Sequence, residues 1–251
     1  MSIEQECGVP FPGEVLPPEQ WTHTSLKHLP MSGPVDWIHL FGRAAPVILD
    51  LGCGNGRSTI GTALQHPEYD CLGLDTLPVV IRYAVRRANQ RGLTNIRFAV
   101  AEAKDFLQRL VAPHSLAEIH LLHPQPYYDM AYVHRRLVTP DFMALVHRAL
   151  QPGGRFLLQT DNPGYWNYLR QLAPLFFSFT ERVAPWPETP EGRTRREILA
   201  RQRDLTIFRG EGIVRTDLDG ETARKLAADL PPPLFNADRR LQSLDRLEGE
   251  K

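Results

Sequence analysis

The chain has few cysteines, no net charge and no long apolar run. Its three cysteines (Cys7, Cys53 and Cys71) are an odd number without metal-ligand spacing. They predict neither a disulfide framework nor a zinc site, and they favour a reducing compartment. No apolar run approaches the roughly 20 residues that cross a bilayer. Lys and Arg total 29, as do Asp and Glu, which argues against a uniformly basic protein but leaves room for one basic face.

The first residues, MSIEQECGVPFPGEV, are acidic and rich in proline. They lack the charged and then apolar pattern of a secretory leader, so we expect a cytoplasmic protein. We expect no metal ion and no membrane contact. The sequence leaves both a monomer and a homodimer open.

Three regions differ in pattern: an irregular N-terminal arm (1–45), a central α/β domain (46–212) and a C-terminal extension (213–251) that reads as a surface tail. In the central region short apolar runs alternate with helical spacing, which predicts a Rossmann-like, mostly parallel twisted sheet with helices on both faces and an antiparallel edge strand. A helix is expected near 79–92, and another from a Thr139 cap and Pro140 to a stop at Pro152–Gly154. The expected strands are 47–51, 71–75, 96–100, 119–122, 154–160 and a later one after Phe176.

The densest motif is ILDLGCGNGRST, in which a buried strand runs into Asp50 and then into Gly52, Gly54 and Gly56. Glycine is needed where the backbone turns tightly and approaches a ligand closely. A dinucleotide site spaces its glycines G-x-G-x-x-G. The G-x-G-x-G spacing here resembles motif I of class I methyltransferases, whose ligand is S-adenosyl-L-methionine. An acid at Asp50 suits the cationic amino group of that ligand better than a pyrophosphate.

Two further acids fit the same ligand. Asp75 ends a predicted strand about 20 residues past the glycines, where this architecture places a carboxylate on the ribose hydroxyls. Glu102 follows the next strand, on the side where we expect the adenine. The predicted cofactor set is Asp50, Gly52, Gly54, Asn55, Gly56, Asp75, Thr76, Glu102, Ala103 and His123.

Two later stretches, LLHPQPYYDMAYVHRRLVTPDFM and TDNPGYW, carry a second resemblance. From about Val47 to Arg209 the chain resembles the bacterial tRNA (guanine-N7-)-methyltransferases, which have F-P-D-P-W-x-K-K-R-H-x-K-R-R-L, then T-D-x-x-x-Y and T-x-x-E. The matching positions are Pro124, Pro126, Arg135, Arg136, Leu137, Pro140, Thr160, Asp161, Tyr165, Thr194 and Glu197.

The resemblance implies a substrate site formed by Asp161, Arg135, Arg136, Thr194 and Glu197, with tRNA as partner. Asp161 is expected to accept from the guanine edge and, with Gln125, to form the catalytic pair. Gln125 stands where the family has the Asp of P-D-P-W, and Tyr127 stands for its Trp. Most of the basic run is also replaced, so the chain is identified as a divergent member.

Other interpretations of these residues remain open. Asp161 in TDNPG also suits an ordinary turn, the two arginines suit a structural role, and Thr194 with Glu197 suits a polar turn. The stretch from Arg193 to Arg215, with seven arginines and three acids, is a further candidate for a tRNA-facing surface. The functional alternatives are a methyltransferase for another RNA or a small molecule, and a cofactor-binding protein without catalysis.

Overall fold

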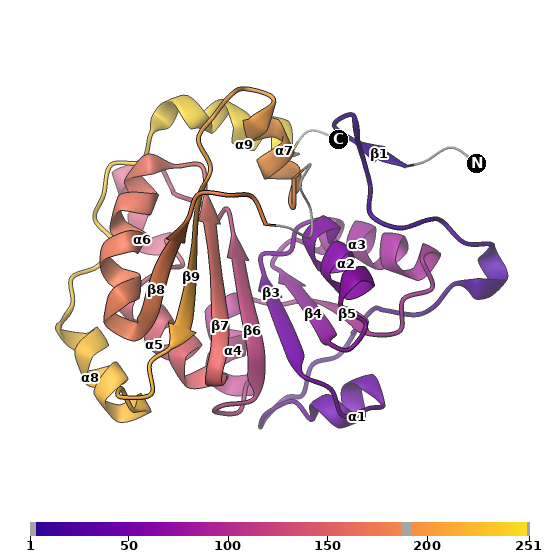
Figure 1. Ribbon diagram of the computed structural model, residues 1–251, viewed down its shortest axis with the longest axis horizontal. Helices are drawn as coiled ribbons and strands as arrows, with labels where there is room; N and C mark the ends of the chain where they lie inside the picture. Colours follow the sequence, from indigo (N-terminus) through magenta and orange to yellow (C-terminus); the bar gives the residue numbers. More distant parts are fainter. Residues whose placement is uncertain (1–3, 187–191, 250–251) are drawn as a thin grey trace.

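A seven-stranded sheet forms the centre of the computed structural model, which describes residues 4–186 and 192–249 (Figure 1). The strand order is β5-β4-β3-β6-β7-β9-β8. The first five of these strands are mutually parallel, and β9 runs antiparallel to both of its neighbours. The α/β fold predicted from the sequence is thereby confirmed. The strands are β3 (Val47–Leu51), β4 (Asp70–Asp75), β5 (Ile96–Val100), β6 (Leu116–Leu122), β7 (Leu150–Thr160), β8 (Phe177–Arg182) and β9 (Phe208–Val214).

Helices cover both faces of this sheet because alternate residues of each strand point to opposite faces. On β3, Ile48 packs into the core cluster under α2 and α3, whereas Leu49 and Leu51 pack into the larger cluster under α4, α5 and α6. The helices are α2 (Arg57–Gln65), α3 (Pro78–Gln90), α4 (Ala103–Leu110), α5 (Pro140–Ala149), α6 (Pro163–Phe176) and α7 (Arg195–Arg201).

Helix α5 begins as the sequence predicts and ends earlier. The Thr139 hydroxyl accepts a hydrogen bond from the Phe142 amide, and Pro140 occupies the first turn. The helix stops at Ala149, and the Pro152–Gly154 stretch, expected to end it, lies inside β7. A break in the β6–β7 register after Leu116 accommodates this stretch. The turn residues therefore act as a strand irregularity, because pairing with β6 resumes on both sides of them.

The N-terminal arm is more ordered than its composition suggests. It contains β1 (Gln5–Glu6), β2 (Val9–Pro10), the 3₁₀ turn η1 (Pro18–Gln20) and α1 (Trp37–Phe41). Further along the arm, the Leu26 amide donates to the Phe98 carbonyl and the Phe98 amide donates to the Thr24 carbonyl. The arm thus covers the open edge of β5, which would otherwise expose unpaired backbone groups.

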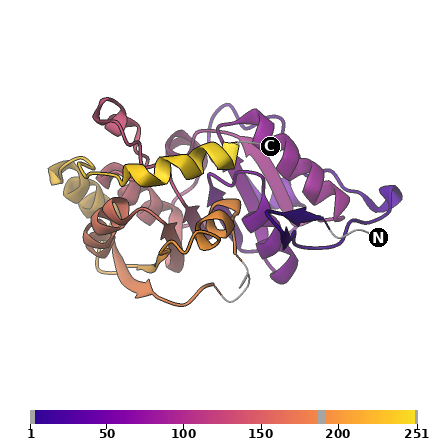
Figure 2. The same ribbon diagram turned by 90° about the horizontal axis from the view of Figure 1, so that it is seen from above.

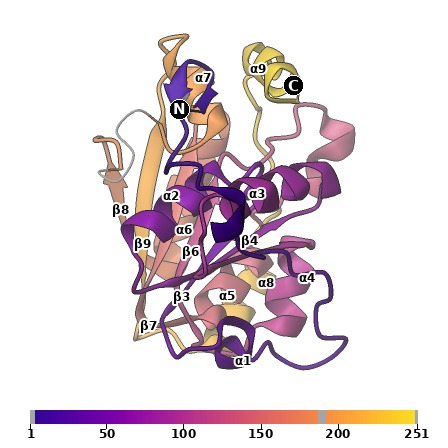
Figure 3. The ribbon, with the colours of Figure 1, turned by 90° about the vertical axis from the view of Figure 1, so that its right-hand side faces the viewer.

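The C-terminal extension, expected as a surface tail, packs against the domain instead. It contains α8 (Gly220–Asp229), the 3₁₀ turn η3 (Arg239–Leu241) and α9 (Gln242–Gly249). Ala223 and Ala227 are buried in the main core, and Leu241 and Leu244 pack with Leu199 of α7. Figures 1 and 3 place α7, α9 and the N-terminal hairpin beyond the sheet edge where β6 and β7 end, and in Figure 2 α9 lies in front of the strands.

The strand order reverses between β3 and β6. From β3 the chain proceeds outward through β4 and β5, and it then returns to place β6 and β7 on the other side of β3. In such sheets the loops that leave the two central strands diverge, and the crevice between them at the carboxyl edge is where ligands bind. The fold therefore positions the site between the loop after β3 and the loop after β6.

We expect Gly56→Ala to lower the free energy of unfolding by about 2 kcal/mol more than Gly153→Ala, because an added methyl group overpacks the contact at Gly56. Both glycines have positive φ, 80° and 74°, so both variants carry similar backbone strain. A Cβ at Gly56 would lie 2.7 Å from the Ala84 Cβ, whereas one at Gly153 meets nothing within 4 Å. Urea unfolding at neutral pH measures the difference. Equal losses in the two variants would show that α2 and α3 are not in tight contact at Gly56.

Candidate active site at the carboxyl edge of the sheet

The glycine loop after β3 is fixed by β4. The Gly52 and Cys53 amides both donate to the Leu74 carbonyl, at 2.8 Å. Gly52 and Gly54 have φ of 75° and 54°, values that favour glycine. A Cβ built on either residue meets no protein atom within 4 Å, so packing against neighbouring protein atoms does not explain why these positions are glycine. This cradle fits a ligand that lies against the loop backbone.

Asp75 closes one side of the cradle. One of its carboxylate oxygens accepts from the Gly54 amide at 3.0 Å, and the other accepts from the Leu77 amide at 2.9 Å. A carboxylate offers about four acceptor sites, so hydroxyl groups of a ligand can still donate to it. The Ala101 amide donates to the Asp75 carbonyl, which holds the loop after β5 beside the same residue.

The remaining members of the predicted cofactor set on this side lie next to Asp75 or in the loop after β5. Thr76 is exposed, Glu102 is exposed and Ala103 is buried. Glu102 is the N-cap of α4, and its carboxylate accepts from the Lys104 and Asp105 amides at 3.0 and 2.7 Å. Its position is therefore fixed by helix capping, whatever else it contacts.

Asp50 lies beneath the loop. It is 2% exposed and accepts from the Thr59 hydroxyl at 2.6 Å. Burial raises the pKa of this carboxyl group, although Thr59 and His120 oppose that effect. Asp50 thus ties β3 to the first turn of α2 and has little surface for a ligand. Asn55, the remaining polar residue of the loop, donates to the Glu6 carboxylate of the N-terminal hairpin.

His123 and Asp161 lie across the switch point, after β6 and β7. His123 has φ of 56°, an uncommon backbone conformation for a non-glycine residue and one that recurs at functional sites. Its Nε2 lies 2.9 Å from the Gln159 amide nitrogen. Its Nδ1 lies 3.6 Å from an Asp161 carboxylate oxygen. Gln125, two residues further on, is exposed.

Asp161 is ionised and paired. Its Oδ2 accepts from the Arg196 Nε at 2.7 Å, and Arg196 also pairs with Asp245 of α9. Burial by itself raises the pKa of Asp161, but His123 and Arg196 outweigh it and lower the pKa to about 2. Asp161 follows the last residue of β7 at a bend, as the turn interpretation expects, but it is also 6% exposed and ion-paired. The C-terminal extension therefore reaches the candidate substrate site through Asp245.

Glu197 is the centre of a second buried network. Its two oxygens accept from the Arg209 guanidinium at 2.6 Å and from the Arg193 amide at 2.8 Å. Gln159 links this network to His123, because its amide nitrogen donates to Glu197 at 3.0 Å. Burial raises the pKa of Glu197, yet these hydrogen bonds lower it to about 2.

Thr194, the partner of Glu197 in the predicted T-x-x-E element, is the N-cap of α7. Its hydroxyl accepts from the Glu197 amide at 3.0 Å. The T-x-x-E element therefore begins a helix and directs Glu197 into the core. It does not form the polar turn that the sequence also allowed. Trp186 contributes from the other side by donating its indole N–H to Gln159 at 2.8 Å.

Arg135 and Arg136 have different environments despite being adjacent. Arg136 is 2% exposed, lies over the Phe235 ring and donates to the carbonyls of Pro126, Tyr127 and Pro233. It joins the loop after β6 to the C-terminal extension. Arg135 is exposed on the 3₁₀ turn η2 (Met130–Arg135) and lies over the Tyr132 ring. Of the two, only Arg135 is exposed to solvent.

Most arginines of the basic stretch from Arg193 to Arg215 are buried or ion-paired. Arg193, Arg196 and Arg209 are buried, and Arg201 and Arg215 are paired with Glu197 and Asp217. The expectation of a tRNA-facing face along this whole segment is therefore wrong. Arg196 and Arg209 balance the buried Asp161 and Glu197, because a buried carboxylate is tolerated only with a partner.

Four residues of these networks were not predicted individually as site residues: Gln159, Trp186, Arg196 and Asp245. They lie on four different elements or loops, and only the packing of β7, α7 and α9 brings them together.

Within residues 4–186 and 192–249, no three His, Cys, Asp or Glu side chains gather in a cluster able to hold a metal ion. Among the same residues, no helix combines the length and apolar character that crossing a membrane requires.

We expect Glu197→Gln to cost about 3 kcal/mol of stability at pH 7, because it leaves buried Arg209 without its counter-charge. A carboxyl group whose pKa is lowered on folding stabilises the protein above its ordinary pKa of 4.5, and this contribution is lost as the pH falls towards 2. The stability difference between wild type and variant should therefore shrink between pH 5 and pH 2.5, which urea unfolding at several pH values measures. Glu221→Gln, in an exposed pair with Lys225, is the control and should change little at any pH. A difference that stays constant down to pH 3 would contradict the assignment.

The comparisons with known proteins concern the family and the fold. The family model Methyltransf_4, whose description reads "Putative methyltransferase", matches residues 44–209. A protein of Nitrosococcus oceani named tRNA (guanine-N(7)-)-methyltransferase is 31% identical over 177 residues, which are 70% of this chain and 75% of that protein. A protein of the same name from Saccharophagus degradans is 30% identical over 61% of this chain and 66% of its own length. A third, from Nitrosomonas eutropha, is 37% identical over 53% of this chain and 59% of its own length.

The last two alignments span less than two thirds of the relatives' own lengths. Among solved structures, the crystal structure of the 16S rRNA methyltransferase KamB superposes with a TM-score of 0.56 at 18% identity, over 76% of this chain and 98% of that one. At this identity the likeness concerns the fold alone. Because the family model covers the glycine loop, the loops after β4 to β7 and the T-x-x-E element, the chain belongs to that methyltransferase family, as a divergent relative of the tRNA (guanine-N(7)-)-methyltransferases.

Proposed function

We propose that this protein uses S-adenosyl-L-methionine to methylate N7 of a guanine in tRNA. The observation that carries the proposal is the ionised Asp161 carboxylate at the same sheet edge as the glycine cradle, across the switch point between β3 and β6. The names of the relatives supply the substrate class. When bound, the cofactor supplies a methyl group on a sulfonium, which a ring nitrogen attacks directly.

The cradle suits this cofactor better than a dinucleotide. The open backbone at Gly52 and Gly54 admits the amino acid part, and Asp75 has acceptor sites left for the ribose hydroxyls. We assign Thr76, Glu102 and Ala103 to the adenine side, because the loop after β5 is tied to Asp75. Asp50 acts from beneath the loop by holding β3 against α2. Asn55, linked to Glu6, and Gly56, packed on α3, keep the remainder of the loop in place.

The chemistry at N7 needs no base, because its lone pair is free before the reaction. The protein has to hold N7 in line with the methyl group, and such positioning contributes roughly 7–11 kcal/mol in favourable cases. The guanine N1–H and N2–H groups are donors, so they fit an ionised carboxylate such as Asp161. A carboxylate with a pKa of about 2 also stays anionic while the purine acquires positive charge.

Arg196 already occupies part of the Asp161 carboxylate. Its Nε donates to Oδ2, whereas Oδ1 faces His123 Nδ1 at 3.6 Å. A guanine edge therefore approaches the Oδ1 side, where His123 forms the other wall. Gln125, exposed in the same loop, offers an amide to the base, and Arg135 offers a guanidinium to a phosphate of the RNA. Thr194 and Glu197 act indirectly, because they place Arg196 and Gln159.

A second candidate is the same reaction on another RNA or on a small molecule. Gln125 stands where the family has an acid, and Arg136 is buried, so the loop offers fewer charges to a tRNA than the family pattern does. The third alternative, cofactor binding without catalysis, rests on Gln125 alone. Product analysis separates the three.

We expect Asp75→Ala to weaken the binding of S-adenosyl-L-homocysteine by roughly 1–3 kcal/mol, because it removes the carboxylate assigned to the ribose. Isothermal calorimetry measures the loss. Asp229→Ala, at the end of α8 and remote from the cradle, is the control and should bind as wild type. Unchanged affinity in Asp75→Ala would mean that the ribose lies elsewhere.

The purified protein should transfer radiolabelled methyl groups to unmodified tRNA transcripts and produce 7-methylguanosine, identified by mass spectrometry of the nucleosides. A transcript made with 7-deazaguanosine lacks the accepting nitrogen and should remain unlabelled. Asp161→Asn should lower turnover at least tenfold while cofactor affinity changes less than twofold, because one charge-assisted hydrogen bond is worth about 1.5–3 kcal/mol.

Labelling of the 7-deaza transcript would place the methyl group at another atom. Labelling of small molecules but no RNA would support the second candidate, and cofactor binding without any transfer would support the third. Equal losses of turnover and cofactor affinity in Asp161→Asn would move Asp161 into the cofactor pocket.

A further inference from the structure

Helix α3 lies in the most basic stretch of the chain. From Thr76 to Ala101 the sequence has five arginines and no acidic residue. Three of them are used inside the protein: Arg87 and Arg91 pair with Glu4, and Arg97 donates to the backbone carbonyls of Thr94 and Ile96. Arg82 and Arg86 are exposed and, within the described residues, have no ion pair. Spaced four residues apart, they lie on the same side of the helix.

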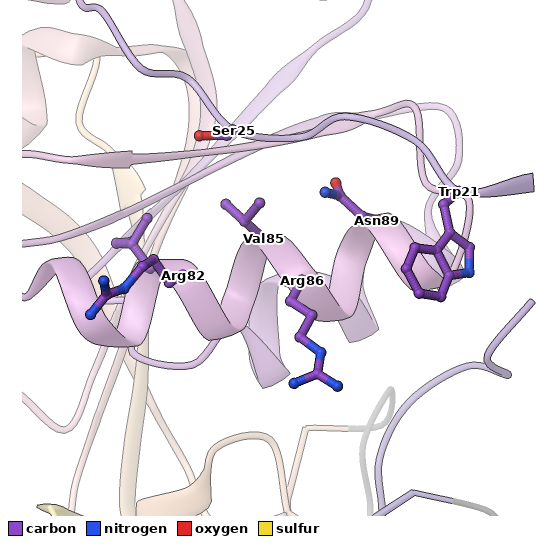
Figure 4. A pocket seen from close by; sticks show the side chains of 7 residues that line it. Trp21, Ser25, Arg82, Val85, Arg86 and Asn89 are labelled. Carbon is purple, nitrogen blue, oxygen red and sulfur yellow. The ribbon is translucent and has the colours of Figure 1, made fainter. Parts of the chain in front are cut away.

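A hollow of about 280 Å³ lies beside these two arginines (Figure 4). One wall is α3, which contributes Ile81, Val85 and Asn89, and the other is the arm segment with Trp21 and Ser25. Figure 4 shows Trp21 at the far end of the helix from Arg82, with Arg86 between them. The hollow thus combines apolar side chains, an aromatic ring, two small polar groups and two cations.

The Trp21 end of the hollow is rigidly built. The Trp21 indole N–H donates to the Leu16 carbonyl at 2.8 Å, and the ring is 42% exposed. The arm is fastened to α3 by Thr24, whose amide and hydroxyl both donate to the Asn89 side-chain oxygen, at 2.8 and 2.9 Å. An exposed aromatic ring held in one orientation binds a flat partner with little loss of conformational freedom.

The chemistry of this surface fits an unpaired nucleotide of an RNA chain. Bases stack on aromatic side chains irrespective of their sequence, and arginines next to the ring hold the phosphates. An acidic protein segment would also meet the arginines, but the exposed indole would contribute no specific contact to it. Charge complementarity and the aromatic ring together therefore favour RNA.

The position of the hollow suits an RNA bound at the candidate active site. Pro78, the first residue of α3, follows Asp75 by three residues, so the helix begins beside the cofactor cradle. At 1.5 Å per residue, Arg82 and Arg86 lie roughly 6 and 12 Å along the helix from Pro78. An RNA whose target guanine faces Asp161 can continue over the cradle onto this helix.

We infer that the hollow between α3 and the arm is a second RNA contact, which takes a nucleotide other than the target guanine, with its base on Trp21 and backbone phosphates on Arg82 and Arg86. That the RNA is tRNA rests on the proposed function. The contact adds affinity and positions the RNA, and it takes no part in methyl transfer.

The test compares the full-length Arg82→Gln/Arg86→Gln double variant with wild type. The dissociation constant for a tRNA transcript is measured by fluorescence anisotropy over a range of KCl concentrations. The double variant should reduce the slope of log affinity against log salt by about 2, one for each phosphate contact. The KM for tRNA should rise several-fold, whereas kcat and the affinity for S-adenosyl-L-homocysteine should stay within twofold of wild type.

Arg224→Gln is the matched control, because Arg224 is an exposed arginine on α8 with no ion pair among the described residues. It should leave the slope unchanged. Trp21→Ala should weaken RNA binding about fivefold or more, and Trp21→Phe, which retains a ring, should recover part of it. Thermal unfolding of each variant checks that the fold is kept.

An unchanged salt slope in the double variant, with a wild-type protein that methylates tRNA, overturns this inference and leaves the proposed function standing. A wild-type protein that transfers no methyl group but binds RNA with a slope that the double variant lowers keeps the inference and refutes the proposed function. A wild-type protein without affinity for RNA overturns both.

Discussion

The reversal of strand order between β3 and β6 is the constraint on which the rest of the structure depends. It separates the loops that leave these strands, and it places the glycine cradle on one side of a crevice and His123 and Asp161 on the other. In the function that we propose, the cradle and Asp75 hold the nucleoside, and the ionised carboxylate of Asp161 in the opposite loop holds the base. The reaction that we propose takes place where the two meet.

The distribution of charge reconciles a net charge of zero with the role in RNA methylation that we propose. Many of its arginines are internal: Arg136 holds backbone carbonyls, and Arg196 and Arg209 neutralise Asp161 and Glu197. Burying these charges costs desolvation free energy, which the several hydrogen bonds of each arginine offset. Exposed arginines near the site, such as Arg135, Arg82 and Arg86, are therefore the ones that we expect to contact phosphates.

Both ends of the chain converge on the site. The N-terminal hairpin bonds to the glycine loop through Glu6 and Asn55 and to α7 through the Cys7 carbonyl and Gln202. The C-terminal helix α9 reaches Asp161 through Asp245 and Arg196. The segments outside the βα units therefore help to hold the site. Changes to either end are expected to affect catalysis as well as stability, because the same side chains serve both.

The sequence by itself determined the local features. The alternation of apolar runs located β3 to β7, because buried parallel strands need continuous apolar residues. Three further features were evident because each depends only on neighbouring residues in the chain: the glycine spacing, the place of Asp75 at a strand end, and the helix start at Thr139 and Pro140. A resemblance in order and spacing was also enough to identify the methyltransferase family.

Only the tertiary structure decided which charged residues are available. Arg135 and Arg136 are adjacent in sequence, yet one is exposed and the other is buried under the C-terminal extension. In the arginine-rich stretch from residue 193 to 215, expected as a surface, Arg196 and Arg209 are buried and pair with Asp161 and Glu197. Asp245, Gln159 and Trp186 acquired their places only when distant segments packed together. Burial and pairing are properties of the whole fold, because they depend on what comes to lie beside a side chain in space, and that information is not local to any stretch of sequence.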